Sequence, residues 1–459
     1  MEERETEKLF EIISIIKTKI KQFCTDWSIK GIIKKENQIR FSESQIDINK
    51  NWDEIKLELF LSQKRRTIEI TLNDLRPFTI EKTLNNCKKL LNVAKLNINY
   101  KRLPEGPFAY NNAIKNKIYD KSVEQLGEKA IDLVEKATET SIKEGAKRVA
   151  GSFFYGGTLF HIENSIGLKG SYKRTRLNFR IRAFAEDMYS TGEALSCSTH
   201  LNHGFDAVGA GEEAGRICKQ AKRGKKGDPG VYNIIIYPKV TTELQAPTPA
   251  IAMNLYVQKM GLAWLVGKRK GDQIANDIVS VWDDGTKEYG LRSAPFDDEL
   301  VPSKKSLLID NGTINQFFTN NSLSKKNEES TGNAGITMPK PTNTVFSTGE
   351  YTLEELMEIS EKPTILITST WYTRYQSYAP PAVLSSLPKD GMFLVKNKGK
   401  LLEPIRELRI NSDHYHMLKN TTALGKDLKQ VSTWLSTSEN TVFAPFMLIE
   451  DIKMSTGTK

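Results

Sequence analysis

The amino-terminal third of the chain switches between two hydrophobic periods. Apolar residues recur at three- and four-residue steps between Glu7 and Cys24, which predicts an amphipathic helix. Residues 55–61 and 68–72 alternate apolar and polar side chains around a polar turn, which predicts a β-hairpin with one buried face. Helical spacing returns over Thr79–Lys95 and over Asp120–Glu144. This order of elements predicts an α/β amino-terminal domain.

From Arg148 onward the period becomes two, most clearly between Arg176 and Ala185. One face of this expected strand is apolar, formed by Leu177, Phe179, Ile181 and Ala183. The other face carries Arg176, Asn178, Arg180 and Arg182. A row of arginines is able to bind carboxylates or phosphates, or to contact a partner subunit. A solvated face of an antiparallel sheet has the same pattern, and a solvated face or a subunit contact is the commoner case.

A basic stretch rich in glycine, Lys219–Gly230, separates this region from the rest and indicates an exposed linker. We place the domain boundary there, giving domains 1–225 and 226–459. Short apolar runs separated by glycine-containing turns fill the second half, with helices expected near Ala250–Val266 and Leu353–Ile359. The predicted fold class is α+β: an amino-terminal α/β domain followed by a mostly antiparallel β carboxyl-terminal domain.

Composition and charge remove several classes of protein. The chain has 459 residues with 66 basic and 56 acidic side chains, a formal net charge of +10. It contains no run of about 18 uncharged apolar residues, and its acidic start lacks the order of a secretory signal. Four cysteines without a Cys-x-x-Cys pair fit free thiols in a reducing compartment. We therefore expect a cytoplasmic protein with no membrane partner. Nucleic acid is not an expected partner, because no aromatic residues interleave with the basic stretch.

Several ordered segments resemble the TldD/PmbA family. The segments are Asn164–Gly167, Gly230–Pro238, Trp282–Gly285, Ala294–Glu299, Ile309–Gly312, Ser330–Gly332, Trp371–Tyr375, Pro404–Arg406 and Pro445–Glu450. Each is short, but their order from about residue 106 to the end makes the resemblance specific. It implies an amino-terminal α/β domain, a mostly β carboxyl-terminal domain, and association with a cytoplasmic peptidase built from a TldD and a TldE (PmbA) subunit.

The resemblance also implies where zinc ligands would stand. The TldD-type subunit carries His-Glu-x-x-x-His on a helix and a late cysteine, so that two imidazoles and a thiolate hold zinc beside a glutamate base. Here the corresponding stretch, Leu244–Leu255, has no histidine, cysteine or carboxylate, and it contains Pro247 and Pro249. Leu424 stands in the place of the cysteine. The chain thus resembles the TldE/PmbA type that lacks metal ligands, so we expect no catalytic, cofactor-binding or metal-binding residue here and zinc in the partner.

A composite metal site is the rival interpretation. Cys197, His200 and His203 lie at three-residue steps, and His414 and His416 would share one face of a strand. No glutamate stands beside these histidines in a peptidase arrangement. An autonomous metal-dependent hydrolase using His200 and His203 therefore remains the less favoured alternative.

The aromatic segment near residue 371 raises a question of peptide binding. Trp371, Tyr372, Tyr375 and Tyr378 either line a groove for peptide or alternate between core and subunit contact. Ser369 and Ser377 lie close by, but no Gly-x-Ser-x-Gly turn encloses either serine. We expect a non-catalytic TldE/PmbA-like subunit of a heteromeric zinc metallopeptidase acting on unfolded peptides, paired with a metal-bearing TldD-like subunit. A homodimeric peptide-binding scaffold is the alternative.

Overall fold

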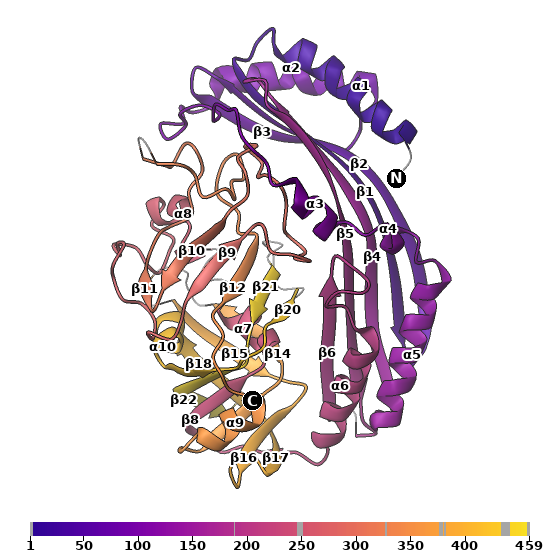
Figure 1. The fold of residues 1–459 in the computed structure, drawn as a ribbon, viewed down its shortest axis with the longest axis vertical. Helices are drawn as coiled ribbons and strands as arrows, with labels where there is room; N and C mark the ends of the chain where they lie inside the picture. The colour runs from indigo at the N-terminus through magenta and orange to yellow at the C-terminus, as the bar shows by residue number, and fades with distance from the viewer. Residues whose placement is uncertain are drawn as a thin grey trace.

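Two halves, each built on β-sheets, pack against one another along the length of the chain (Figure 1). The computed structural model describes residues 3–187, 189–245, 251–325, 328–375, 380, 382–432 and 441–456. The amino-terminal half is a long curved sheet with helices on its outer face, and the carboxyl-terminal half lies against its inner face.

The amino-terminal sheet has six antiparallel strands in the order β3-β2-β1-β4-β5-β6. Its strands are β1 (Asp26–Ser42), β2 (Gln45–Gln63), β3 (Arg66–Leu72), β4 (Arg148–Asn164), β5 (Lys169–Phe184) and β6 (Thr191–Ser198). The main helices are α1 (Glu3–Ile20), α2 (Pro77–Val93), α5 (Glu128–Glu144) and α6 (Ala207–Gln220). Shorter helices are a 3₁₀ turn (Asn112–Ile114), α3 (Lys115–Ile118) and α4 (Lys121–Glu124).

Alternation along the strands gives each sheet face a different partner. On β1, Ile29 and Ile33 pack into the core under α1 and α2, whereas Ile39 packs into the core under α5 and α6. These three positions are all odd, so they share one face and both helix pairs cover that face. The even positions of β5, including Arg180 and Arg182, therefore face the carboxyl-terminal half. The second half covers Arg180 and Arg182, whereas Arg176 at the other end of the row is exposed.

The sequence pattern identified most of these elements. The helix expected over Glu7–Cys24 is α1, the hairpin is formed by β2 and β3, and the helix expected over Thr79–Lys95 is α2. The single long helix expected over Asp120–Glu144 is wrong, because it divides into α4 and α5. Gly127, the residue before α5, has φ +49° at the break, a positive φ that glycine adopts without strain.

The carboxyl-terminal half contains two sheets around one large core. The larger has the order β14-β15-β18-β22-β8-β13-β16-β17-β7, with β19 paired to β22. Its strands are β7 (Lys225–Lys226), β8 (Gly230–Ile236), β13 (Thr364–Ile367), β14 (Thr370–Tyr375), β15 (Val383–Pro388), β16 (Met392–Lys396), β17 (Leu401–Arg406), β18 (Leu408–Asp413), β19 (Thr421–Leu424) and β22 (Met447–Thr456). The smaller sheet consists of β9 (Val281–Asp284), β10 (Lys305–Asp310), β11 (Thr313–Ile314), β12 (Asn343–Phe346), β20 (Lys429–Val431) and β21 (Thr441–Ala444).

Four short helices accompany these sheets in the described part of the chain. They are α7 (Pro238–Leu244), α8 (Leu255–Lys259), α9 (Leu353–Ile359) and α10 (His414–Lys419). The α9 prediction is confirmed, and Thr352 and Glu355 form its capping box. The helix expected over Ala250–Val266 is wrong for most of its length, because among the described residues 251–266 only the five of α8 are α-helical. The fold class itself is confirmed as α+β with a largely antiparallel carboxyl-terminal half.

Apolar and charged contacts join the two halves. Lys30 on β1 forms an ion pair with Asp298 at 2.7 Å, and the Tyr110 hydroxyl donates to the Leu300 carbonyl at 2.8 Å. Tyr172 of β5 packs edge-on against Phe296 of the second half. None of the helices in the described ranges combines the length and apolar character needed to cross a bilayer.

Candidate functional site

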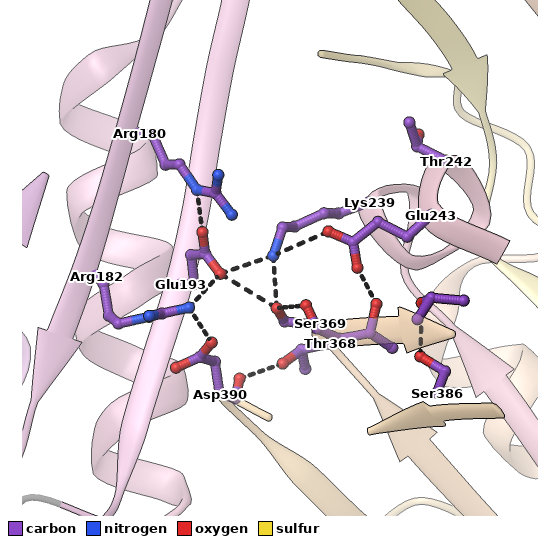
Figure 2. A network of polar contacts seen from close by, with 12 residues as sticks. Arg180, Arg182, Glu193, Lys239, Thr242, Glu243, Thr368, Ser369, Ser386 and Asp390 are labelled. Carbon is purple, nitrogen blue, oxygen red and sulfur yellow. Dashed lines mark hydrogen bonds and ion pairs between the residues drawn. The ribbon is translucent and has the colours of Figure 1, made fainter. Parts of the chain in front are cut away.

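The short helix α7 brings a lysine and a glutamate to the boundary between the two halves. It follows β8 directly and begins at Pro238, whose fixed φ suits a first helical position. Lys239 and Glu243 are four residues apart, so their side chains project from the same face. That face is turned toward β5 and β6, where Arg180, Arg182 and Glu193 meet them (Figure 2).

Glu193 on β6 is the centre of the resulting ion network. Its carboxylate lies 2.7 Å from the Lys239 ammonium and 3.0 Å from the Arg182 guanidinium, and it also accepts a hydrogen bond from Arg180. Arg182 reaches across to Asp390, at 2.7 Å. Figure 2 shows these charges converging from both halves of the chain. Arg180 and Arg182 of the arginine row therefore bind carboxylates of this same chain, which is one of the roles that the sequence pattern offered.

Hydroxyl groups of the β13–β14 segment complete the network. The Lys239 Nζ donates to Ser369 Oγ at 2.5 Å, and the Thr370 hydroxyl donates to Glu243. The Ser369 side chain is fully buried, and Lys239 is paired with a carboxylate. A lysine that acts as a general base must be neutral, and a nucleophilic serine must reach substrate. The Ser369–Lys239 contact is therefore structural.

Burial and charge move the pKa values of the three acids in different directions. Burial alone would raise the pKa of Glu193, but the Lys239, Arg180 and Arg182 cations outweigh burial and hold it well below its usual value. Burial raises the pKa of Glu243 to about 7, with only partial compensation from Lys239. Burial likewise raises the pKa of Asp390 despite its contact with Arg182. One carboxylate is thus fully charged, while Glu243 titrates near neutrality.

The space beside the network is too small for a peptide. A cavity of about 20 Å³ lies between Glu193, Tyr237, Lys239 and Thr368, with room for roughly one water molecule. The network therefore acts as a clamp that fixes α7 against the amino-terminal sheet. Sequence reasoning missed Lys239, Glu243 and Glu193. The four-residue spacing of Lys239 and Glu243 after a proline was the available signal.

Of the residues in the composite metal interpretation, the structure brings together only the rings of His200 and His203, whose centroids are 5.9 Å apart. Among the described residues, no group of three or more histidine, cysteine, aspartate or glutamate side chains is placed to hold a metal. Burial raises the pKa of the Cys197 thiol to about 12, which disfavours the thiolate that zinc requires. The two ring nitrogens of His200 lie 3.1 Å from the Asn116 carbonyl and the Thr199 hydroxyl, and the His203 ring stacks on Tyr289.

The other two histidines are also in packed positions. His414 and His416 were expected on one face of a strand, and this is wrong because they begin helix α10. Residues two apart on a helix point in nearly opposite directions. Burial lowers the pKa of His414 to about 4, and its ring lies between Trp264 and Tyr375. His416 Nε2 contacts the Asp451 carbonyl at 3.0 Å.

The positions where the resemblance would place zinc ligands offer no suitable donor set. Pro247 and Pro249 lie outside the described residues, and residues 246–250 contain no imidazole, thiol or carboxylate in the sequence. In the described remainder, the Asn254 amide caps α8 and donates to the Pro339 carbonyl. Leu424 is buried at the end of β19. The side chains present therefore do not fit a zinc ion.

The aromatic segment forms an exposed sheet edge. Strand β14 ends the larger sheet and pairs only with β15 in the described part of the chain. A bulge between Thr370 and Tyr372 turns two successive aromatic side chains outward, so Trp371 is 45% and Tyr372 51% exposed. Arg182 and Lys389 lie over the Trp371 ring, at 4.8 and 4.3 Å. Tyr378 and Ser377 lie outside the described residues.

The short acidic motifs are structural in this chain. Asp283 accepts hydrogen bonds from Thr342 and Asn333, and burial raises its pKa to about 7. The Asp297 carboxylate accepts hydrogen bonds from the backbone amides of Glu299 and Val301 in a tight turn. These acids hold loops of the carboxyl-terminal half in place.

Comparison with known proteins identifies the class of protein to which this architecture belongs. Residues 229–456 match the family model described as the PmbA/TldA metallopeptidase C-terminal domain. A metalloprotease of Archaeoglobus fulgidus is 27% identical over 167 residues, which is 35% of this chain and 37% of that protein. A metalloprotease of Methanocaldococcus jannaschii is 23% identical over 330 residues, 68% of each protein. The chain thus spans well under half of the first relative and about two thirds of the second.

Solved structures extend the likeness to the whole fold. TldE from Thermococcus kodakarensis superposes with a TM-score of 0.77 at 16% identity, covering 97% of this chain and 99% of that one. A Thermotoga maritima protein whose name connects it with DNA gyrase modulation gives 0.83 at 21% identity, with the same coverage. The chain belongs to the TldD/PmbA family, as its short motifs predicted.

Replacing Lys239 by methionine tests the clamp. Removing one partner of a buried ion pair typically costs about 3–5 kcal/mol, because the remaining charge stays buried. We expect Lys239→Met to lower the unfolding free energy in urea by that amount. The matched control is Lys362→Met, which removes an exposed pair with Asp451 at 2.9 Å and should cost about 1 kcal/mol or less. Equal effects of the two substitutions would contradict the clamp.

Glu243 gives the network a predictable pH dependence. Its folded pKa of about 7 exceeds the unfolded value near 4.5, so the folded state binds the extra proton between these values. The stability from this group is complete below pH 4.5 and is lost as the pH rises through 7. Relative to wild type, Glu243→Gln should gain about 3 kcal/mol in unfolding free energy between pH 4.5 and 8. A constant difference across that range would show that Glu243 titrates normally.

Proposed function

We propose that this chain is the metal-free, TldE/PmbA-like subunit of a two-subunit cytoplasmic peptidase, in which a TldD-like partner carries the zinc. In this assembly the chain binds no metal and performs no bond cleavage. Its role is to close the space around the partner's metal and to hold unfolded peptide in an extended form. Membership of the TldD/PmbA family supports a role in such a peptidase. The side chains of this chain support its assignment as the TldE/PmbA-like subunit.

One observation carries the proposal. Where the family resemblance would place zinc ligands, this chain has Leu244–Leu255, without imidazole, thiol or carboxylate, and Leu424. Replacement of a whole ligand set leaves no partial site for weak metal binding. The buried cations nearby are committed to Glu193 and Asp390, so they do not take over the role of the ion.

The exposed edge of β14 supports the peptide-holding role. An extended peptide that pairs with a free strand edge gains backbone hydrogen bonds with little sequence requirement. Trp371 and Tyr372 provide apolar surface beside that edge. A folded substrate cannot present a free strand, so access is limited to unfolded chains.

Reconstitution tests the subunit assignment. The chain is mixed with a paralogue from the same source that carries His-Glu-x-x-x-His. We expect a heterodimer by native mass spectrometry, and hydrolysis of an unfolded casein fragment that neither subunit shows alone.

The control uses the paralogue with the first histidine of its motif replaced by alanine. This variant should still form the heterodimer but should not cleave. If no complex forms, or if the chain hydrolyses the fragment as a homodimer, the subunit assignment is wrong.

Substitution of the two exposed aromatic residues tests the peptide edge. We expect Trp371→Ala combined with Tyr372→Ala to weaken binding of a fluorescent unfolded peptide to the chain by about tenfold, because buried aromatic anchors dominate such contacts. Tyr189→Ala is the matched control, since Tyr189 is also an exposed aromatic residue beside an arginine. An unchanged affinity in the double variant would exclude β14 as the binding edge.

A further inference from the structure

An exposed apolar surface lies at the end of the amino-terminal half, where α2 finishes. Leu90 and Val93 of α2 are 47% and 76% exposed, and the next segment adds Leu96 and Ile98, 60% and 78% exposed. Apolar residues scattered singly over a surface are ordinary, but four within nine positions are not. Clusters of this kind mark interaction sites. We call this surface, with the basic residues described next, the basic tip.

The two sequence segments that carry the four apolar residues and the turn beside them contain charges of one sign. The stretch 86–104 contains five basic residues and no acidic residue, and the neighbouring turn 63–66 adds three more basic residues. Two of the exposed basic residues are engaged elsewhere, because Lys101 donates to the Ser324 carbonyl and Arg102 pairs with Asp26 and Glu105. The remaining exposed basic side chains are Lys64, Arg65, Lys88, Lys89 and Lys95. None of these five forms an ion pair with another described residue. A surface that combines unpaired cations with apolar side chains is complementary to an acidic, partly apolar one.

The two sequence segments of the basic tip are held together by the fold. Arg66 forms an isolated bridge with Leu96, and the Asn97 amide donates to the Arg65 carbonyl at 2.8 Å. The Arg66 guanidinium also donates to the Ala94 carbonyl. These contacts fix the segment after α2 against the β2–β3 turn (Figure 1). The surface is therefore preformed, which reduces the entropy lost on binding.

We propose that the basic tip is a docking surface for the metal-bearing partner subunit, which would present an acidic-rimmed apolar patch to it. This inference rests on the proposed function, since it names the contact through which that partner is held. The four apolar side chains supply the buried centre of the contact, and the surrounding lysines and arginines supply orientation and association rate.

The same charges act against self-association through this surface. A two-fold homodimer built on the basic tip would place each tip against its own copy. Two surfaces carrying only positive charge repel one another at the distance of an interface. The surface therefore favours a different, acidic partner over a second copy of this chain, because repulsion between like charges disfavours the homodimer.

Binding to the His-Glu-x-x-x-His paralogue tests this surface. Val93→Glu combined with Ile98→Glu should weaken the heterodimer at least tenfold in titrations followed by native mass spectrometry. Lys88→Glu combined with Lys95→Glu should also weaken it at least tenfold and reduce its dependence on salt. All four side chains are exposed, so the thermal unfolding midpoint should be unchanged. Val231→Glu combined with Leu262→Glu, at exposed apolar positions elsewhere, is the control and should bind like wild type.

Each contrary outcome has a distinct meaning. If wild type and tip variants bind the paralogue equally, the docking surface is wrong and the proposed function stands. If wild type does not bind the paralogue, both are wrong. If the tip variants keep the paralogue but lose binding to phosphatidylserine vesicles that wild type shows, the basic tip contacts lipid and the inference is overturned.

Discussion

The structure depends on a carboxylate, Glu193, that is almost fully buried between two domains. Isolated, such a charge would be strongly destabilising, so it persists only because three cations from both halves converge on it. Lys239 comes from α7 and the arginines come from β5. The consequence is that α7 is fixed against the amino-terminal sheet.

That clamp explains why a site rich in charged residues is not a catalytic centre. Every cation of the network contacts the Glu193 carboxylate, and the adjoining cavity admits roughly one water molecule. Catalysis needs a reactive group that substrate can reach, in the protonation state that the step requires. Here the buried groups stabilise the contact between domains, whereas accessibility is found at β14 and at the basic tip. This separation of buried charges from accessible surface is what the proposed subunit role requires.

The spacing of apolar residues predicted the helices and strands whose pattern is contained within one short segment of the sequence. The stripes of α1 and α2 and the alternation of β2 and β3 are visible in sequence because one side of each element is apolar. The break at Gly127 was missed because the apolar spacing continues across it. Helix α7 was missed because seven residues are too few to show a period, and His414 was misplaced for the same reason.

The polar contacts could not be predicted, since they join residues far apart in the chain. The arginine face of β5 has the pattern of a solvated strand, and only the tertiary structure shows a second domain covering it. Similarly, exposure of Leu90, Val93, Leu96 and Ile98 depends on what the fold leaves uncovered. The family, in contrast, was correctly identified from short motifs, because turns and acids that hold loops constrain sequence locally.

Zinc analysis of the complex purified from its native source tests the central claim most directly. After gentle separation of the subunits, metal is quantified in each by inductively coupled plasma mass spectrometry. The account predicts stoichiometric zinc in the partner and only background zinc in this chain, also after chelator treatment and reloading. Stoichiometric zinc held by this chain's own side chains would contradict it.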